Sequence, residues 1–323
     1  MTVRIGIVGT GFGARVVAPA FASTEGCEVV EVVSARDAAA ADALCRRPDL
    51  DLVSVHSPPF LHADHVRAAL DAGHAVLCDK PFALSAGEAT ELLAEAERAG
   101  VVHLVNFEFR QDPVREQLRA LMTDGAVGRV EHVQWTHLSS GSRVPLRPFG
   151  WLFERASGGG WIGAWGAHAI DALRSTFGEV SEAEAWLRTD VPERPDTEGV
   201  IHRCDAEDGF SAWLTLEVGA TVAIDSSFAA PVSLAPRLVV CGSEGLLECV
   251  ADARITVRRS DGAREELERP ATAGDPHLAP MRRWARVVRD AVLADEAPVD
   301  APTFADGLAC DLVLDRLRTS TRE

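Results

Sequence analysis

The sequence has no long run of basic residues and no apolar stretch long enough to span a bilayer. Its 49 acidic residues outnumber the 32 basic ones and give a formal charge of −17. Phosphate binding needs clustered Lys and Arg, so this charge disfavours nucleic acids and anionic membrane surfaces as partners. We therefore expect this protein to bind neither nucleic acid nor membrane.

The seven cysteines are scattered, without the C-x-x-C spacing of zinc sites and redox dithiols. This pattern is typical of small apolar residues in a reducing compartment, and no metal site is implied. The N-terminus leads directly into a predicted strand, Val3–Val8, without the charged and apolar regions of a signal peptide. These features predict a cytoplasmic protein.

Residues 1–122 alternate between short apolar runs and alanine-rich, helix-length segments. Continuous apolar runs are typical of parallel strands covered by helices on both faces. Their repetition predicts a doubly wound α/β fold, the Rossmann dinucleotide-binding domain. The runs are Val3–Val8, Val29–Val33, Leu52–His56, Ala75–Cys78 and Val101–Asn106.

Residues 123–323 have a different pattern, in which candidate strands cluster without intervening helices. This arrangement predicts a second α/β domain whose sheet is largely antiparallel and open on one face. We expect helices over Trp161–Phe177, His277–Ala294 and Phe304–Thr319, and the last of these can pack back on the first domain. The candidate strands are Val130–Leu138, Glu184–Leu187, Val200–Cys204, Phe210–Leu216, Thr221–Phe228, Arg237–Cys241, Leu246–Val250 and Arg254–Arg258.

A glycine-rich turn, Gly9-Thr10-Gly11-Phe12-Gly13-Ala14, separates the first predicted strand from the first helix. The first glycine allows a tight reversal, Gly11 lets a pyrophosphate approach the main chain, and a small residue at Ala14 lets helix and strand pack closely. Free amides at the start of the helix then bind the diphosphate. The turn therefore predicts a dinucleotide site that includes Phe12 and Gly13.

The end of the second predicted strand indicates which dinucleotide is bound. An acidic residue at this place binds the adenosine ribose of NAD, whereas the sequence here reads Ser34-Ala35-Arg36-Asp37. A hydroxyl and a guanidinium suit a 2′-phosphate, because Arg pairs with phosphate through two hydrogen bonds. We therefore favour NADP(H) over NAD(H). The alternative is that Arg36 is solvated and Asp37 binds the ribose.

Two further stretches of sequence carry a family resemblance. One is His56-Ser57-Pro58-Pro59-Phe60-Leu61-His62, followed by Asp79-Lys80-Pro81, and the other runs from Gly158-Gly159-Gly160 through His168 to Asp171. Together with the turn at Gly9, they resemble the Gfo/Idh/MocA family of glucose–fructose oxidoreductase and inositol dehydrogenase. The resemblance covers nearly the whole chain, and Asp79-Lys80-Pro81 is similar to the family's Glu-Lys-Pro signature.

The resemblance implies that Lys80 lies beside the nicotinamide ring and the substrate hydroxyl, where an ammonium stabilises a developing alkoxide. His168 matches the family's general base. Asp171, on the same helix face, is a candidate to orient it or is a helix-face carboxylate. One position departs from the family pattern. Many members carry Asp four residues before this histidine, and this chain has Ala164 there, so transfer of the inositol dehydrogenase mechanism is in doubt.

The resemblance also implies contacts around the cofactor and the substrate. Trp161 and Trp165 are candidates to stack on a sugar, or else they belong to the core. The other positions that match the family's cofactor-binding positions are Ser57, Pro58, His62, Asp79, Pro81 and Asn106, with Arg110 as a candidate substrate contact. His62 could equally be a residue that starts a helix.

These observations predict an NAD(P)-dependent oxidoreductase that transfers a hydride at a secondary alcohol or ketone of a sugar, sugar derivative or cyclitol. Two alternatives remain open, a dehydrogenase of a non-sugar substrate such as a dihydrodiol and a catalytically silent NADP(H)-binding regulator. The resemblance further implies that residues 123–323 bind the substrate and mediate oligomerisation, with a homodimer or homotetramer that forms through the open face of the second sheet.

Overall fold

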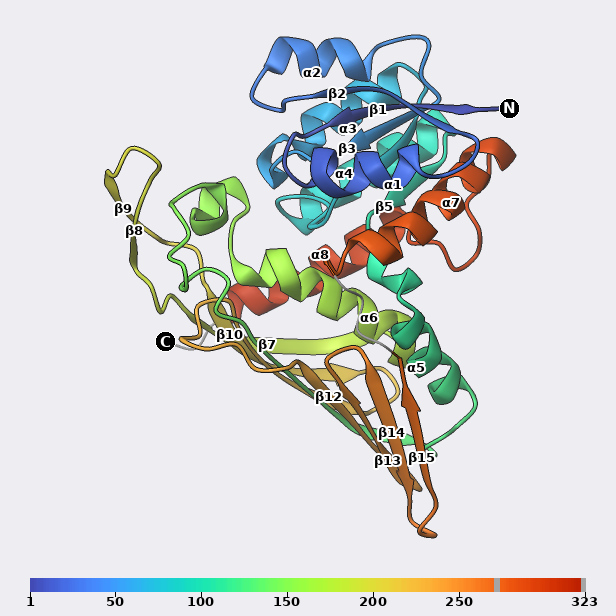
Figure 1. Ribbon diagram of the computed structural model, residues 1–323, viewed down its shortest axis with the longest axis vertical. Coiled ribbons are helices and arrows are strands. Elements are labelled where there is room, and N and C mark those ends of the chain that lie inside the picture. Colours follow the sequence, from blue (N-terminus) through green and yellow to red (C-terminus); the bar gives the residue numbers. More distant parts are fainter. Residues whose placement is uncertain (270–273, 321–323) are drawn as a thin grey trace. The chain divides into compact units, whose positions relative to one another are not determined.

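The computed structural model describes residues 1–269 and 274–320 of the chain (Figure 1). The chain divides into two compact units, each with a large sheet of its own. Unit 1 comprises Met1–Gln111 and Ala273–Leu312, and unit 2 comprises Asp112–Thr272 and Val313–Glu323. Among the described residues, no helix is both long and apolar enough to cross a membrane.

Unit 1 has the predicted Rossmann fold. Its five strands are ordered β2-β1-β3-β4-β5 and all neighbours are parallel. The order reverses between β1 and β3, and sheets of this kind bind ligands in the crevice outside the carboxyl ends of such strands. The strands are β1 (Val3–Val8), β2 (Cys27–Val33), β3 (Leu52–Val55), β4 (Ala75–Cys78) and β5 (His103–Val105), and the helices are α1 (Ala18–Ala22), α2 (Ala38–Cys45), α3 (His62–Asp71), α4 (Ala86–Ala99) and α7 (Leu278–Ala294).

Helix α7 belongs to the core of unit 1, although it lies far along the chain. Its Met281 and Trp284 are fully buried in one apolar cluster with Ile5 and Leu77 of the sheet. Apolar side chains repeat along one stripe of α7, and this spacing makes one face of a helix bury against a sheet. The sheet of unit 1 is therefore covered partly by a helix from the last fifth of the sequence.

Local signals explain where the helices of unit 1 begin and end. The hydroxyl of Ser85 accepts a hydrogen bond from the backbone N–H of Glu88 (3.2 Å) at the start of α4, as expected for this N-cap spacing. The helix ends at Gly100, whose φ of +65° is the left-handed conformation of a C-terminal stop.

Unit 2 is built on an eight-stranded sheet, ordered β15-β14-β13-β12-β6-β11-β10-β7. It is mostly antiparallel, as predicted, with one parallel pair, β6 and β11. Figure 1 shows α5 and α6 on one face of this sheet. Its strands are β6 (Val130–Leu138), β7 (Val180–Arg188), β10 (Gly209–Leu216), β11 (Thr221–Ser227), β12 (Arg237–Gly242), β13 (Gly245–Val250), β14 (Arg254–Arg259) and β15 (Arg264–Glu268), and its helices include α5 (Pro113–Thr123) and α6 (Ala167–Phe177).

Several elements differ from the sequence-based expectation. The predicted strand Val200–Cys204 is shorter, β9 (Ile201–Arg203), and pairs with β8 (Glu193–Pro195) in a separate two-stranded sheet. Helix α5 and strand β15 were not expected. The amphipathic helix α5 begins with Asp112 as its N-cap and Pro113 at its first position, which is a recognisable start signal. Helix α8 (Phe304–Thr319) has the predicted bounds and runs through the division between the units at Leu312.

Candidate active site

The glycine-rich turn lies at the carboxyl end of β1, beside the point where the strand order reverses. Gly9 has a φ of +129°, and a Cβ atom there would lie 2.3 Å from the carbonyl oxygen of His56, so the turn requires glycine. A Cβ atom on Gly13 would have neighbours at 3.1 Å, so the close helix–strand packing assigned to Ala14 is found at Gly13. Beside Gly11 nothing lies within 4 Å of such an atom. The open space at Gly11 suits a ligand that binds against the backbone.

The loop after β2 leaves one cation available. The backbone N–H of Arg36 donates to the hydroxyl of Ser34 (3.2 Å), and the carboxylate of Asp37 accepts from the N–H of Ala40 (3.0 Å) as the N-cap of α2. The guanidinium of Arg36 is exposed and has no hydrogen bond or ion pair within the described part of the chain. Asp37 is therefore engaged in a helix cap, whereas Arg36 is free to bind an anion.

A polar network joins the carboxyl ends of β3, β4 and β5. The Asp79 carboxylate accepts from the backbone N–H of Lys80 (3.0 Å) and the amide of Asn106 (3.3 Å), and lies 3.3 Å from Nδ1 of His56. Burial acts to raise the pKa of Asp79, but the hydrogen bond and charge of His56 and the charge of Lys80 outweigh it and lower that pKa. Asp79 is therefore an ionised anchor for the backbone at Lys80.

The side-chain oxygen of Asn106 is an orphan in this network. Asn106 is fully buried, and its Oδ1 atom has no hydrogen-bond partner among residues 1–269 and 274–320. A buried carbonyl oxygen without a donor costs about 1–3 kcal/mol. A polar ligand at the carboxyl end of β5 would satisfy it.

The loop that carries Lys80 is held from several sides. The backbone N–H of Ala83 donates to the buried Asp311 carboxylate (2.9 Å), and the ring of Phe82 packs 4.3 Å from that of Phe304. Both partners lie on α8, in the part that belongs to unit 1. Lys80 itself is half-buried. Together with the bond between Asp79 and the backbone N–H of Lys80, these contacts fix the backbone on both sides of Pro81.

Two of the predicted cofactor contacts have structural partners of their own. His62 is buried, and its Nε2 and Nδ1 atoms lie 2.8 Å from the carbonyl oxygen of Ser57 and 3.2 Å from that of Phe82. Burial lowers the pKa of His62, so the ring is neutral and can donate only one bond, to the nearer oxygen of Ser57. The Ser57 hydroxyl lies 3.1 Å from Nδ1 of His65. His62 therefore lies between the loop around Pro58 and the Lys80 loop and donates its one hydrogen bond to the former.

Arg110, the predicted substrate contact, is engaged in an ion pair. Its guanidinium lies 2.7 Å from the carboxylate of Asp306 and donates to the carbonyl oxygen of Asp300 (3.3 Å). The side chain is 10% exposed. These contacts favour a structural role for Arg110 in anchoring the start of α8.

In unit 2, the triple-glycine loop before α6 has a steric explanation. A Cβ atom on Gly159 would lie within 2.7 Å of three backbone oxygens, and one on Gly160 would overlap the carboxylate of Glu207. That carboxylate accepts from the backbone N–H of Ile162 (3.1 Å), and the Glu207 carbonyl accepts from the N–H of Trp161 (2.8 Å). Burial raises the pKa of Glu207. Sequence reasoning missed this residue, which caps the segment leading to His168.

The helix with the predicted base starts in a π-helical segment, η6 (Ile162–Gly166), and continues as α6. Such segments are rare and are frequent at functional sites. His168 and Asp171 are both buried on α6. The methyl group of Ala164 packs against an apolar cluster that includes Leu152 and Phe153.

Trp161 and Trp165 belong to an aromatic cluster between η6 and the sheet of unit 2. The Trp161 ring stacks 4.3 Å from Phe228 and donates from Nε1 to the Ser226 hydroxyl (2.8 Å). His137 lies 4.7 Å from Trp165 and 5.8 Å from Trp161. Both indoles are half-buried, so each has a packing role and some remaining exposed surface.

Comparison with known proteins adds to this geometry. Residues 3–107 match the family model described as "Oxidoreductase family, NAD-binding Rossmann fold", and residues 115–248 match the "GFO/IDH/MocA C-terminal domain". The chain is 30% identical over 315 residues to the D-apiose dehydrogenase of Paraburkholderia graminis, covering 89% of this chain and 76% of that one. The chain belongs to the Gfo/Idh/MocA oxidoreductase family. As a member, it is a nicotinamide-dependent oxidoreductase.

Two other matches differ in their cofactor. The D-xylose 1-dehydrogenase (NADP(+)) 2 of Haloferax volcanii is 31% identical over 244 residues, which are 70% of each chain. A levoglucosan dehydrogenase solved in complex with NADH and L-sorbose superimposes with a TM-score of 0.87, covering 99% of this chain and 96% of that one at 23% identity. This protein and the levoglucosan dehydrogenase therefore share one fold over nearly the whole length of both chains.

The residues of unit 1 fit the nicotinamide cofactor of the family. The open space at Gly11 gives the diphosphate access to the main chain, and the orphan oxygen of Asn106 offers an acceptor to a polar group of the cofactor. Arg36 provides a free cation at the end of β2. These three features lie at the carboxyl edge of the sheet, where sheets of this kind bind dinucleotides.

Two counts in the sequence strengthen the interpretation of Lys80. It is the only lysine in the chain, whereas every other basic side chain apart from histidine is arginine, and the chain contains no tyrosine. Arginine cannot release its proton near neutral pH, whereas lysine can when it is desolvated. Tyrosine is therefore excluded as the acid–base residue, and Lys80 is the one lysine that can serve.

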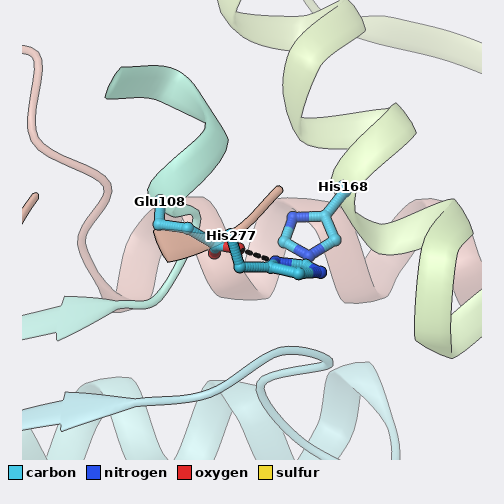
Figure 2. A group of neighbouring side chains, drawn as sticks. All are labelled: Glu108, His168 and His277. Atoms are coloured by element: carbon cyan, nitrogen blue, oxygen red, sulfur yellow. Dashed lines mark hydrogen bonds and ion pairs between the residues drawn. The ribbon is translucent and has the colours of Figure 1, made fainter. Parts of the chain in front are cut away.

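A buried acid–imidazole pair in unit 1 was also missed by sequence reasoning. Glu108 is fully buried in η3 (Glu108–Gln111), and its Oε1 atom lies 2.6 Å from Nδ1 of His277 (Figure 2). The two residues are 169 positions apart. The signal for Glu108 in the sequence is its position three residues after the carboxyl end of the parallel strand β5.

Proposed function

We propose that the enzyme transfers a hydride between NADP(H) and a secondary alcohol, or the matching ketone, of a sugar, sugar derivative or cyclitol. The bound nicotinamide supplies the hydride donor or acceptor. The observation that carries the choice of NADP(H) is the free guanidinium of Arg36 beside an Asp37 that is engaged in the cap of α2. An NADP-dependent relative of 31% identity supports the same choice.

Lys80 and His168 handle the proton in this proposal. The Lys80 ammonium donates a hydrogen bond to the substrate oxygen and stabilises the negative charge that grows on it as the hydroxyl proton leaves. Asp79 fixes the backbone N–H of Lys80, and Asp311 fixes that of Ala83, so the backbone that carries the ammonium is held at the carboxyl end of β4. His168 takes the proton of the hydroxyl group, and Asp171 is a positioning residue on the same helix.

The choice of a sugar rests on two observations. The relatives described above include dehydrogenases named for D-apiose and D-xylose. The indoles of Trp161 and Trp165 retain exposed surface near the start of the helix that carries His168, and indole faces stack on the apolar face of a pyranose. A dihydrodiol could also stack there, so it remains the second candidate.

The proposal is tested by the purified enzyme with NADP+ or NAD+ and a panel of aldoses, anhydro sugars, cyclitols and a dihydrodiol. We expect NADPH formation with at least one sugar or cyclitol, and a higher kcat/KM with NADP+ than with NAD+. If the enzyme turns over only the dihydrodiol, its substrate is a dihydrodiol and not a sugar or cyclitol. Tight NADPH binding without turnover of any panel member or its ketone would favour the silent regulator.

We further propose a homodimer or homotetramer that forms through the sheet of unit 2. Trp186 on β7 and Trp213 on β10 are 39% and 49% exposed on the same sheet face. Exposed indoles on a flat sheet face favour association. Light scattering during size-exclusion chromatography tests this, with Trp213→Arg as the variant expected to be monomeric.

A further inference from the structure

The Glu108–His277 pair has the geometry of an acid–base dyad. The Oε1–Nδ1 separation of 2.6 Å is short for an N–H···O bond, which is typical of bonds between charged or partly charged groups. A carboxylate can only accept, so Nδ1 carries the proton that is donated to Glu108. This assigns Nε2 as the imidazole atom that exchanges a proton with a substrate.

The buried position of Glu108 makes this arrangement costly in folding free energy. The carboxylate is fully buried, and its Oε2 atom has no hydrogen-bond partner in the described ranges. A buried polar oxygen without a hydrogen-bond partner costs about 1–3 kcal/mol, and such atoms are rare in native structures and can mark a catalytic role. Unit 1 already has a structural histidine, His62, whose two ring nitrogens both face carbonyl oxygens.

The pair lies next to the cofactor-binding features of unit 1. The ring of His277 meets that of Phe12, in the glycine-rich turn, edge-on at 5.2 Å, and packs 4.8 Å from Phe109. His277 is 31% exposed, so a ligand can reach it. Figure 2 shows its imidazole held by Glu108; the third side chain drawn there, His168, belongs to unit 2. A second acid, Asp275, accepts a hydrogen bond from the backbone N–H of His277 (3.0 Å).

We propose that His277 is a catalytic acid–base residue of the hydride-transfer reaction and that Glu108 is its positioning residue. In alcohol oxidation, the hydroxyl proton passes to Nε2 of His277, in place of His168, and a C=O double bond forms. The adjacent C–H hydrogen leaves with its two electrons to the oxidised nicotinamide, so atoms and charge balance. Glu108 stabilises the resulting imidazolium, a role that Ala164 cannot fill one turn before His168. This inference rests on the proposed function.

The first test is a set of pH profiles of kcat/KM on the best alcohol of the panel. His277→Gln should lower kcat by about 10²–10⁴-fold with a few-fold change in KM, and should remove one acidic limb. Glu108→Gln should keep the limb but move it to lower pH, because a carboxylate stabilises an adjacent imidazolium. His202→Gln is the matched control, since His202 has a similar contact with Asp196 (2.8 Å) in the two-stranded sheet of unit 2.

The second test does not depend on turnover. Nitrogen-15 NMR of histidine-labelled enzyme, assigned with His277→Gln, should show the Nδ1–H tautomer of His277 at high pH, and Glu108→Gln should shift it toward Nε2–H. An Nε2–H tautomer in the wild type would overturn the assignment. If His277→Gln retains the acidic limb and His168→Gln loses it, His277 is not the base. A wild-type enzyme that oxidises no alcohol would instead overturn the proposed function, and this inference with it.

Discussion

The carboxylate of Glu207 accepts a hydrogen bond from the backbone N–H of Ile162 at 3.1 Å, in the space that a side chain on Gly160 would fill. One interaction thus explains both the last glycine of the triple-glycine loop and the start of the helix with His168. Gly160 and Glu207 are 47 positions apart, so the contact between them could not be predicted from the sequence alone.

Glu207→Ala should lower the free energy of unfolding by about 1–3 kcal/mol, because it leaves the N–H of Ile162 buried without an acceptor. Urea denaturation at pH 7 measures this. Glu217→Ala is the control, because Glu217 is exposed, and surface substitutions of this kind usually change stability by less than about 0.5 kcal/mol. Equal effects of the two substitutions would show that the contact is not important for stability.

The parts of the fold that could be predicted are those with a local signal. The glycine-rich turn, the Ser85 cap and the strand–helix alternation each depend on neighbouring residues, and the structure has them. Partnerships between distant residues could not be predicted. Glu108 and His277 meet because the start of α7 returns to unit 1, and Arg110 is paired by Asp306 because the start of α8 does so as well.

Arg36→Ala should weaken binding of NADPH much more than that of NADH. A charge-assisted bond to a 2′-phosphate contributes about 1.5–3 kcal/mol, or roughly tenfold to a hundredfold in Kd, and NADH lacks this phosphate. Fluorescence titration of the two reduced cofactors measures the ratio. Asp37→Asn is the companion variant, with little expected effect on either cofactor because an asparagine also caps a helix. An equal loss for both cofactors in Arg36→Ala would contradict NADP(H) selection by this residue.

Lys80→Met should leave the Kd of the dinucleotide within a few-fold and lower turnover at least about a hundredfold. Lys80→Arg separates charge from proton release, because it keeps a cation that does not deprotonate. Since Lys80 is the only lysine, reductive methylation with carbon-13 formaldehyde labels it and the N-terminal amine alone, and the NMR signal can be followed against pH. A methionine variant that keeps most of its activity would exclude Lys80 from catalysis.

His137 gives a pH dependence whose sign follows from its burial. Burial is the main reason that its pKa falls from 6.5 to about 4, with the charge of Arg115 adding to the decrease and that of Asp252 opposing it. Between these values the unfolded chain binds a proton at this residue and the folded chain does not. The stability of unit 2 should therefore be highest above pH 6.5 and fall as the pH decreases toward 4, by up to about 1.4 kcal/mol per pH unit.

The test compares urea unfolding of the wild type and His137→Gln at pH 7 and pH 5, followed by tryptophan fluorescence. Six of the seven tryptophans lie in unit 2, so the signal reports mainly this unit. Other buried histidines, such as His62, act in the same direction, and the comparison with His137→Gln removes their contribution. The wild type should lose about 2 kcal/mol more than the variant between the two pH values. Equal losses would mean that the imidazole between Trp161 and Trp165 accepts a proton as readily in the folded protein as in the unfolded chain.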